Sequence, residues 1–326
     1  MIMKMKRYTI MMSLATALLG LGACSSEDGT DNMTGTAYLQ LTTEIATSRA
    51  IIDATAFNTG DQVDLFYSTA NGSGQTRAVC DNGKWSISPA VTLDGNSVGI
   101  AGIANFGKGD ITPDENGEQN DILLGLPNKS NYTYINAANP VVPMKFHHVL
   151  ARVSFQVKSE GGNEQLTRLS LKNIDKGSAI STRYDSTLVE YAYSLANNMR
   201  QDAIYSSKWN DFQTRMQEYL AQYRQPATLT LNKTLTLTEN VQTIDLLVIP
   251  TTINSSNRVA LELAIDGNVY SVELPYTTWS SNCKYVYPVN IDVTKDWPNA
   301  VSISSVVITP WTSSGEGNVE NTWNMD

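Results

Sequence analysis

Histidine and cysteine are scarce in this sequence, and the scarcity restricts its chemistry. Among 326 residues there are two histidines and three cysteines. A Ser-His-Asp triad or a histidine-rich zinc site has few residues to draw on, and the zinc-protease pattern H-E-x-x-H is absent. We expect no catalytic residue, no metal site and no cofactor, and we predict that the protein is not an enzyme. Paired carboxylates of the glycosidase kind stay open, because they need no proximity in sequence.

The two histidines, His147 and His148, are adjacent in a segment with strand character. Side chains alternate between the two faces of a strand, so these rings point apart and cannot easily share a metal ion. His147 falls on the same face as the apolar Val149 and Val153, which predicts a hydrogen-bonded histidine at the margin of the core. His148 is expected at the surface.

Acidic residues outnumber basic ones by 32 to 23, which gives a formal net charge of −9. Such a chain does not attract nucleic acid or anionic lipid. Acidic residues also cluster among glycines and a proline, which predicts a solvated acidic loop, with loose calcium binding as the alternative. The cluster consists of Asp110, Asp114, Glu115, Glu118 and Asp121.

The N-terminus has the order of a bacterial lipoprotein signal. A basic start precedes an apolar run over 8–21, and Gly22-Ala23-Cys24 follows as a lipobox. The run is short for a membrane span, so we predict a cleaved signal peptide at 1–23. Fatty acyl chains such as palmitate would then anchor Cys24, with 24–37 as a lipidated tether. A plain signal peptide with an incidental cysteine is the alternative.

Short segments with a period of two, separated by Asn-Gly and Asp-Gly turns, dominate the remaining chain. This pattern indicates an all-β fold of β-sandwiches, and about 300 mature residues suit two of them. We place an N-terminal domain at 38–176 and a C-terminal domain at 177–326. The expected strands cover 38–45, 63–67, 84–87, 98–105, 149–157, 228–237, 243–249, 259–265, 268–274, 285–293 and 301–309.

One stretch departs from the strand pattern. Apolar residues recur at helical spacing in two stripes over about 187–224, and Pro226 would end the second stripe. We interpret these stripes as a helical insertion in the C-terminal domain, packed on its sheet. Cys80 and Cys283 fall in different predicted domains, so two buried free thiols are favoured over a disulfide.

The first strand and the segment after it form the candidate assembly site. The candidate displaced strand contains Tyr38, Leu39, Leu41 and Ile45. A basic sequence that looks exposed follows, and a protease that cut between Arg49 and Ala50 would release the strand. The sheet would then expose an apolar groove and unpaired backbone groups, which a strand of another chain could fill. The alternative is that Arg49 is an ordinary surface arginine.

Several short motifs follow one another along the mature chain. They are Ser48-Arg49-Ala50, the segments 60–66, 146–155 and 246–250, Trp279 with Tyr285-Val286-Tyr287, and Ile308-Thr309-Pro310-Trp311. In this order and spacing they resemble the fimbrillin family, the lipoprotein-derived subunits of type V pili. The resemblance implies two transthyretin-like β-sandwich domains, export as a lipoprotein, cleavage after Arg49 and polymerisation by strand exchange.

We therefore predict a structural subunit of cell-surface fimbriae at the outer membrane, with a role in adhesion. The implied partners are other fimbrillin subunits, in a homo- or hetero-polymer, and host or bacterial surface ligands. The alternative is a cell-surface glycan-binding lipoprotein with tryptophans as stacking platforms. Its candidate platforms are Trp85, Trp209, Trp279 and Trp311. A stalk, tip or anchor role stays open, because Asp64, Asn282 and the helical stretch depart from the family pattern.

Overall fold

Alternation of apolar and polar side chains is realised as strands, and the predicted all-β fold is confirmed. The computed structural model describes residues 36–45, 56–106, 113, 117, 119–127, 135–175, 190, 192–197, 226–296 and 299–311. Every segment expected as a strand coincides or overlaps with one, although 301–309 is divided between two. Within the described residues, helix occurs only at 190 and 192–197, and the rest of the expected helical insertion lies outside them.

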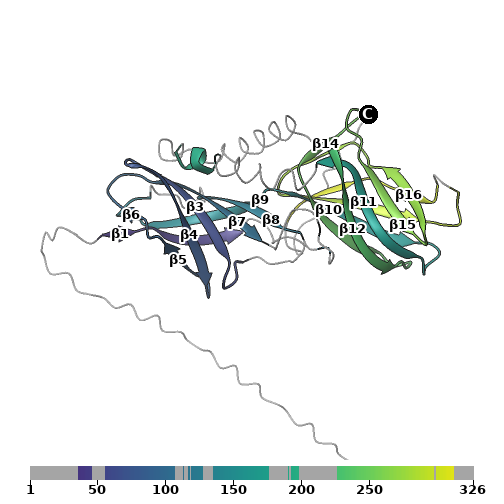
Figure 1. Ribbon diagram of the computed structural model, residues 1–326, viewed down its shortest axis with the longest axis horizontal. Coiled ribbons are helices and arrows are strands. Elements are labelled where there is room, and N and C mark those ends of the chain that lie inside the picture. Colours follow the sequence, from purple (N-terminus) through teal and green to yellow (C-terminus); the bar gives the residue numbers. More distant parts are fainter. Residues whose placement is uncertain are drawn as a thin grey trace, which may run out of the picture. The chain divides into compact units, whose positions relative to one another are not determined.

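A seven-stranded sheet contains the first part of the described chain (Figure 1). Its order is β2-β9-β8-β7-β3-β4-β5, and neighbours run antiparallel except for β2 and β9, which are parallel. Its strands are β2 (Gln40–Ile45), β3 (Gln62–Thr69), β4 (Gly72–Asp81), β5 (Lys84–Ser88), β7 (Gly99–Phe106), β8 (Asp121–Pro127) and β9 (Val141–His148). A small antiparallel pair, β1 (Ala37–Tyr38) and β6 (Thr92–Leu93), accompanies it.

Two glycines on neighbouring strands make room for the core of this sheet. Gly102 of β7 lies opposite Gly125 of β8. A Cβ atom at Gly125 would lie 2.5 Å from Cε1 of Phe146, and one at Gly102 would lie 2.7 Å from Sδ of Met144. Phe146 and Met144 of β9 are both buried in the space that the glycines leave. The packing of this sheet therefore depends on β9.

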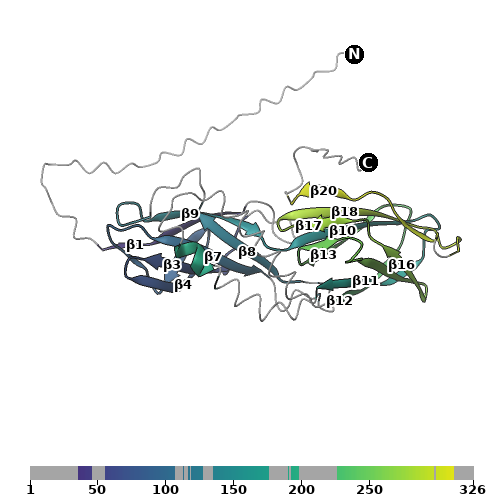
Figure 2. The same cartoon turned by 90° about the horizontal axis from the view of Figure 1, so that it is seen from above.

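Two further sheets contain the later part of the chain (Figure 2). One has the order β13-β10-β18-β19, with β20 also paired to β18, and the other has the order β12-β11-β15-β16. Their strands are β10 (Ala151–Ser159), β11 (Gln165–Asp175), β12 (Pro226–Thr236), β13 (Gln242–Val248), β15 (Ala260–Ile265), β16 (Asn268–Glu273), β18 (Cys283–Ile291), β19 (Val301–Ile303) and β20 (Val307–Pro310). The pair β14 (Thr251–Ile253) and β17 (Thr277–Trp279) runs antiparallel.

The inward side chains of these two sheets form a common core, which gives them a sandwich-like arrangement. Phe155 of β10 and Tyr287 of β18 stack with ring centroids 5.6 Å apart, and they meet leucines of β11 and β15 such as Leu169 and Leu263. Trp279 Nε1 donates a hydrogen bond to the Tyr287 hydroxyl at 2.8 Å. The buried indole and phenol thus satisfy each other inside an apolar core.

The chain passes from the seven-stranded sheet to the later sheets at residues 149–150, between β9 and β10. The predicted domain boundary lies later, at residue 176. β10 and β11 precede residue 176, yet they pair with β13, β18, β12 and β15, which all follow it. A third apolar cluster includes Leu124 of β8, Leu150 between β9 and β10, Leu247 of β13 and Trp311 after β20. Residues of early and late strands therefore share one core.

Candidate functional site

β2, the strand expected to be displaced, lies at the edge of the seven-stranded sheet. It pairs with β9 from Gln40 opposite Val141 to Ile45 opposite Phe146. Leu39, Leu41 and Ile45 are 5–7% exposed and belong to the core of that sheet, whereas Tyr38 of β1 is 51% exposed. The edge strand thus covers apolar side chains that would otherwise face solvent.

The exposed side of β2 makes polar contacts with β9. Thr42 Oγ1 donates a hydrogen bond to the carbonyl oxygen of Val142 at 3.4 Å. The ammonium group of Lys145 lies 3.1 Å from the Glu44 carboxylate, an exposed pair that contributes about 1 kcal/mol at most. Buried side chains and backbone pairing therefore hold β2, rather than ion pairs.

Trp85 joins β2 to the opposite edge strand of the same sheet. Its Nε1 donates a hydrogen bond to Thr43 Oγ1 at 3.2 Å. Its ring meets Phe57 edge to face, with centroids 5.0 Å apart, and Phe57 meets Phe146 in the same way. β2 and β5 are the two edges of the sheet order. Contact between them closes the sheet around its core, and no local sequence pattern predicts this contact.

The predicted cleavage and lipidation sites lie outside the described residues. Cys24, Arg49 and Ala50 all belong to undescribed segments. β2 ends at Ile45 and the described chain resumes at residue 56 before β3. Arg49 therefore belongs to the connection between the edge strand and the rest of the sheet. The tether at 24–37 is undescribed except for its last two residues.

The expected orientation of the two histidines is wrong. His148 is fully buried, with Nδ1 2.7 Å from the Asp121 carboxylate and its ring stacked on Trp311 at 3.9 Å between centroids. His147 is only partly buried. β9 ends at His148 and the backbone bends over 149–150, which breaks the alternation on which the expectation rested. Burial lowers the pKa of His147 to about 4, with a smaller contribution from Lys145.

Asp121 also departs from expectation. It was expected in a solvated acidic loop, but it begins β8 and has no exposed surface. The other four residues of the acidic cluster lie outside the described residues. Nowhere in the described part of the chain do three or more His, Cys, Asp or Glu side chains gather as metal ligands. Cys80 is buried and Cys283 partly buried, both as free thiols.

Two of the four candidate tryptophan platforms of the glycan-binding alternative are buried. Trp279 and Trp311 have no exposed surface, and Trp85 is half-buried against Phe57. Trp209 lies outside the described residues. Large rings here fill cores, which is the commonest use of aromatic side chains. They leave no exposed indole face for a sugar at positions 279 and 311.

One hydrolase pattern, G-x-S-x-G, does occur in the sequence, at 95–99. A nucleophile elbow requires a sharp turn from a strand into a helix. Ser97 instead lies in the loop that leads into β7. Of the two histidines, His148 is buried against Asp121 and Trp311, so it is not available as a base at this loop. The match is therefore incidental.

Comparison with known protein families decides the classification. A model of the fimbrillin-like family matches residues 48–311, which is most of the chain. The chain belongs to the fimbrillin-like family. The match begins next to Arg49 and ends at Trp311, so this fimbrillin-like protein has the family pattern over nearly all described strands. Among curated proteins, none matches it. No helix among the described residues is long and apolar enough to cross a membrane.

Several solved structures are similar to this fimbrillin-like chain at low identity. A candidate cell adhesion protein from Bacteroides uniformis is 11% identical, with a TM-score of 0.47 and coverage of 85% of this chain and 99% of that one. The C-terminally truncated tip fimbrial protein Mfa3 of Porphyromonas gingivalis is 11% identical, with a TM-score of 0.44 and coverage of 85% and 100%. A fimbrial protein from Bacteroides vulgatus is 12% identical, with a TM-score of 0.43 and coverage of 84% and 99%.

Proposed function

We propose that this fimbrillin-like protein is a structural subunit of cell-surface fimbriae that assembles by exchange of β2. A protease cuts after Arg49, β2 leaves, and a strand of another subunit takes its place beside β9. The observation that supports this proposal is the position of β2. It is an edge strand in which Leu41 and Ile45 are buried, as is Leu39 just before it, and the segment that connects it to β3 contains Arg49.

The energetics favour exchange over simple loss of the strand. Burial of Leu39, Leu41 and Ile45 contributes about 2 kcal/mol each, or about 6 kcal/mol together, before ordering costs. Removal of β2 would uncover β9, whose Val142, Met144 and Phe146 are at most 1% exposed. A cut chain therefore keeps β2 bound until a competing strand arrives, since an empty groove is costly.

β9 itself has a feature of an edge strand. Pro143, its third residue, lies opposite Thr42 in the pairing with β2. Proline has no backbone N–H and is found mainly in edge strands, at strand starts and at bulges. The Gln40 N–H donates to the carbonyl oxygen of Pro140 at 2.8 Å, so β2 bonds with the even-numbered residues of β9 and Pro143 removes no donor from that pairing. A strand that replaces β2 would meet the same backbone donors on β9.

The wider proposal follows the family pattern. The subunit reaches the outer membrane as a lipoprotein with acylated Cys24, and two transthyretin-like β-sandwich domains with a helical insertion form its body. Its partners are other fimbrillin subunits, in a homo- or hetero-polymer, and its adhesion ligands lie on host or bacterial surfaces. Acyl chains contribute about 0.8 kcal/mol per buried CH₂, so cleavage after Arg49 would also release a stalk subunit from its anchor.

Arginine-specific digestion tests the proposal, because Trp85 contacts the departing strand. The mature protein is digested briefly and its new N-terminus is identified by sequencing and intact mass. We expect a start at Ala50. Trp85 emission should change when the cleaved segment that contains β2 is diluted away, and detergent-resistant ladders should form at high protein concentration. Trp85→Phe should remove the emission change without preventing the cut.

Two variants separate strand exchange from general proteolysis. Arg49→Ala should block the cut, the emission change and the ladders. Arg258→Ala is a matched control. Arg258 is an exposed arginine in the later part of the chain, where it pairs with Glu273. It should behave like the unchanged protein. Ladders formed equally well by Arg49→Ala would contradict cleavage-dependent exchange.

A further inference from the structure

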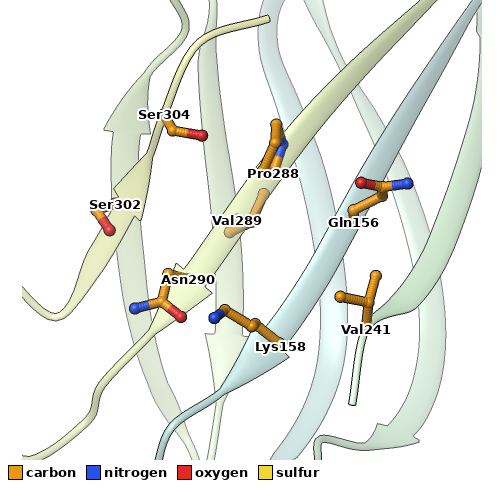
Figure 3. A pocket seen from close by; sticks show the side chains of 8 residues that line it. All are labelled: Gln156, Lys158, Val241, Pro288, Val289, Asn290, Ser302 and Ser304. Atoms are coloured by element: carbon orange, nitrogen blue, oxygen red, sulfur yellow. The ribbon is translucent and has the colours of Figure 1, made fainter. Parts of the chain in front are cut away.

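The outward face of the sheet that contains β10 and β18 has a shallow hollow with polar walls (Figure 3). Strand pairing places Gln156 opposite Pro288 and Lys158 opposite Asn290, while Asn290 also lies opposite Ser302 of β19. Ser304 follows β19, and its backbone N–H donates to the Pro288 carbonyl oxygen at 3.4 Å. Three strands thus bring amide, ammonium and hydroxyl groups to one place.

The hollow measures about 320 Å³. Small-molecule sites typically occupy roughly 300–1,000 Å³, so this one suits a ligand of about the size of a single sugar residue. The core side of the same sheet is filled by Phe155 and Tyr287, so the hollow does not continue into the interior. A ligand there would rest on the ring of Pro288, with polar groups around its rim, because the side chain of Val289 points into the core.

Asn290 has an acceptor that none of the described residues satisfies. Its Nδ2 donates a hydrogen bond to Glu160 Oε1 at 2.6 Å, which fixes the orientation of the amide. Its Oδ1 is buried and has no hydrogen-bond partner. Figure 3 shows this oxygen and the Lys158 nitrogen turned toward each other across the hollow. This oxygen can therefore accept a hydrogen bond from a ligand donor, such as a hydroxyl group.

Charge narrows the choice of ligand. Lys158 is the charged residue that lines the hollow, in a chain with a net charge of −9. Its ammonium group favours a carboxylate, while Asn290 Oδ1 requires a hydroxyl donor, and the serine hydroxyls can pair with either. A saccharide residue that bears a carboxylate offers both groups on one small ring. Neutral sugars lack the anion, and simple anions lack the hydroxyls.

We propose that this hollow binds an acidic saccharide residue, with Lys158 on its carboxylate and Asn290 Oδ1 on one of its hydroxyls. The site goes beyond the assembly function and does not depend on strand exchange. It also differs from a tryptophan platform, because polar groups and a proline surface replace a stacked indole.

Titration by ligand-observed NMR tests the site in the full-length mature protein in detergent. The probes are methyl glucuronide, methyl glucoside and acetate at constant ionic strength. We expect saturable binding of the glucuronide with a Kd of about 1 mM. The glucoside and acetate should each bind at least about fivefold more weakly, because each lacks one of the two groups. Equal binding of all three probes, or no saturable binding of the glucuronide, would overturn the proposal.

Variants assign the binding to this hollow. Lys158→Met keeps the aliphatic stem and should weaken glucuronide binding about tenfold, to the level of the glucoside. Asn290→Asp places a carboxylate beside the ligand and should also weaken it. Lys233→Met is the matched control, because Lys233 is an exposed lysine of β12 in the other sheet. Loss of binding in Lys233→Met, or unchanged binding in Lys158→Met, would place the sugar elsewhere and refute the assignment.

Discussion

At the residue scale, the environment of His148 shows how one buried polar group joins distant segments. Its Nδ1 meets Asp121, its backbone N–H donates to Asn282 Oδ1 at 3.3 Å, and its ring stacks on Trp311. Asn282 has φ 62°, a conformation that asparagine tolerates better than most residues. Asn282 is one of the departures from the family pattern, and its side-chain oxygen accepts a hydrogen bond that a glycine at this turn could not accept.

His147 leads to a pH prediction. Its folded pKa of about 4 lies below the ordinary value near 6.5, so between these values the unfolded chain binds more protons. Its contribution to stability is therefore complete above pH 6.5 and is lost as the pH falls toward 4, by at most about 3 kcal/mol. Urea unfolding at pH 7 and pH 4 should show a smaller difference in His147→Gln than in the unchanged protein. An identical difference in both proteins would show that His147 does not contribute.

At the element scale, the expected strands omitted β4, β6, β8, β11, β14, β17 and all of β9 except the strand character given to its two histidines. β8 is buried at every residue and includes a glycine and a proline, so it shows no alternation. β9 contains Pro143, and a proline argues against a strand unless that strand lies at the edge of its sheet. β4 begins Gly72-Ser73-Gly74, a weak strand pattern. Alternation did identify β2, β3 and most late strands, because each has one buried and one exposed face.

The glycine pair on β7 and β8 gives the element-scale prediction. Gly125→Ala places a methyl group 2.5 Å from the Phe146 ring, so β9 must shift. We expect a loss of about 1–3 kcal/mol in the free energy of unfolding, measured by urea denaturation. Gly95→Ala is the matched control, because a Cβ there meets nothing within 4 Å. Equal stability of both variants would mean that the sheet can absorb the added methyl group.

At the scale of the whole molecule, the sequence predicted sandwich-like sheets but not which strands pair with one another. The candidate displaced strand was predicted from alternation and position, whereas its neighbours β9 and Trp85 were not, since they lie about 40 to 100 residues away in the chain. The same limit applies to β10, which precedes the predicted boundary at 176. β10 pairs with β13 and in parallel with β18, both beyond residue 240, and no local pattern encodes such pairing.

Two fragments test where the later sheets begin. A fragment of 177–326 lacks β10, the strand between β13 and β18, and β11, the strand between β12 and β15. It would leave both sheets divided and the core around Phe155 empty, so we expect no cooperative thermal transition. A fragment of 151–326 contains every strand of both sheets and should unfold cooperatively, although without Leu124 and its neighbours it loses part of the shared cluster around Trp311. Calorimetry compares the two. A cooperative transition in 177–326 would show that β10 and β11 are dispensable, and the domain boundary at 176 would then stand.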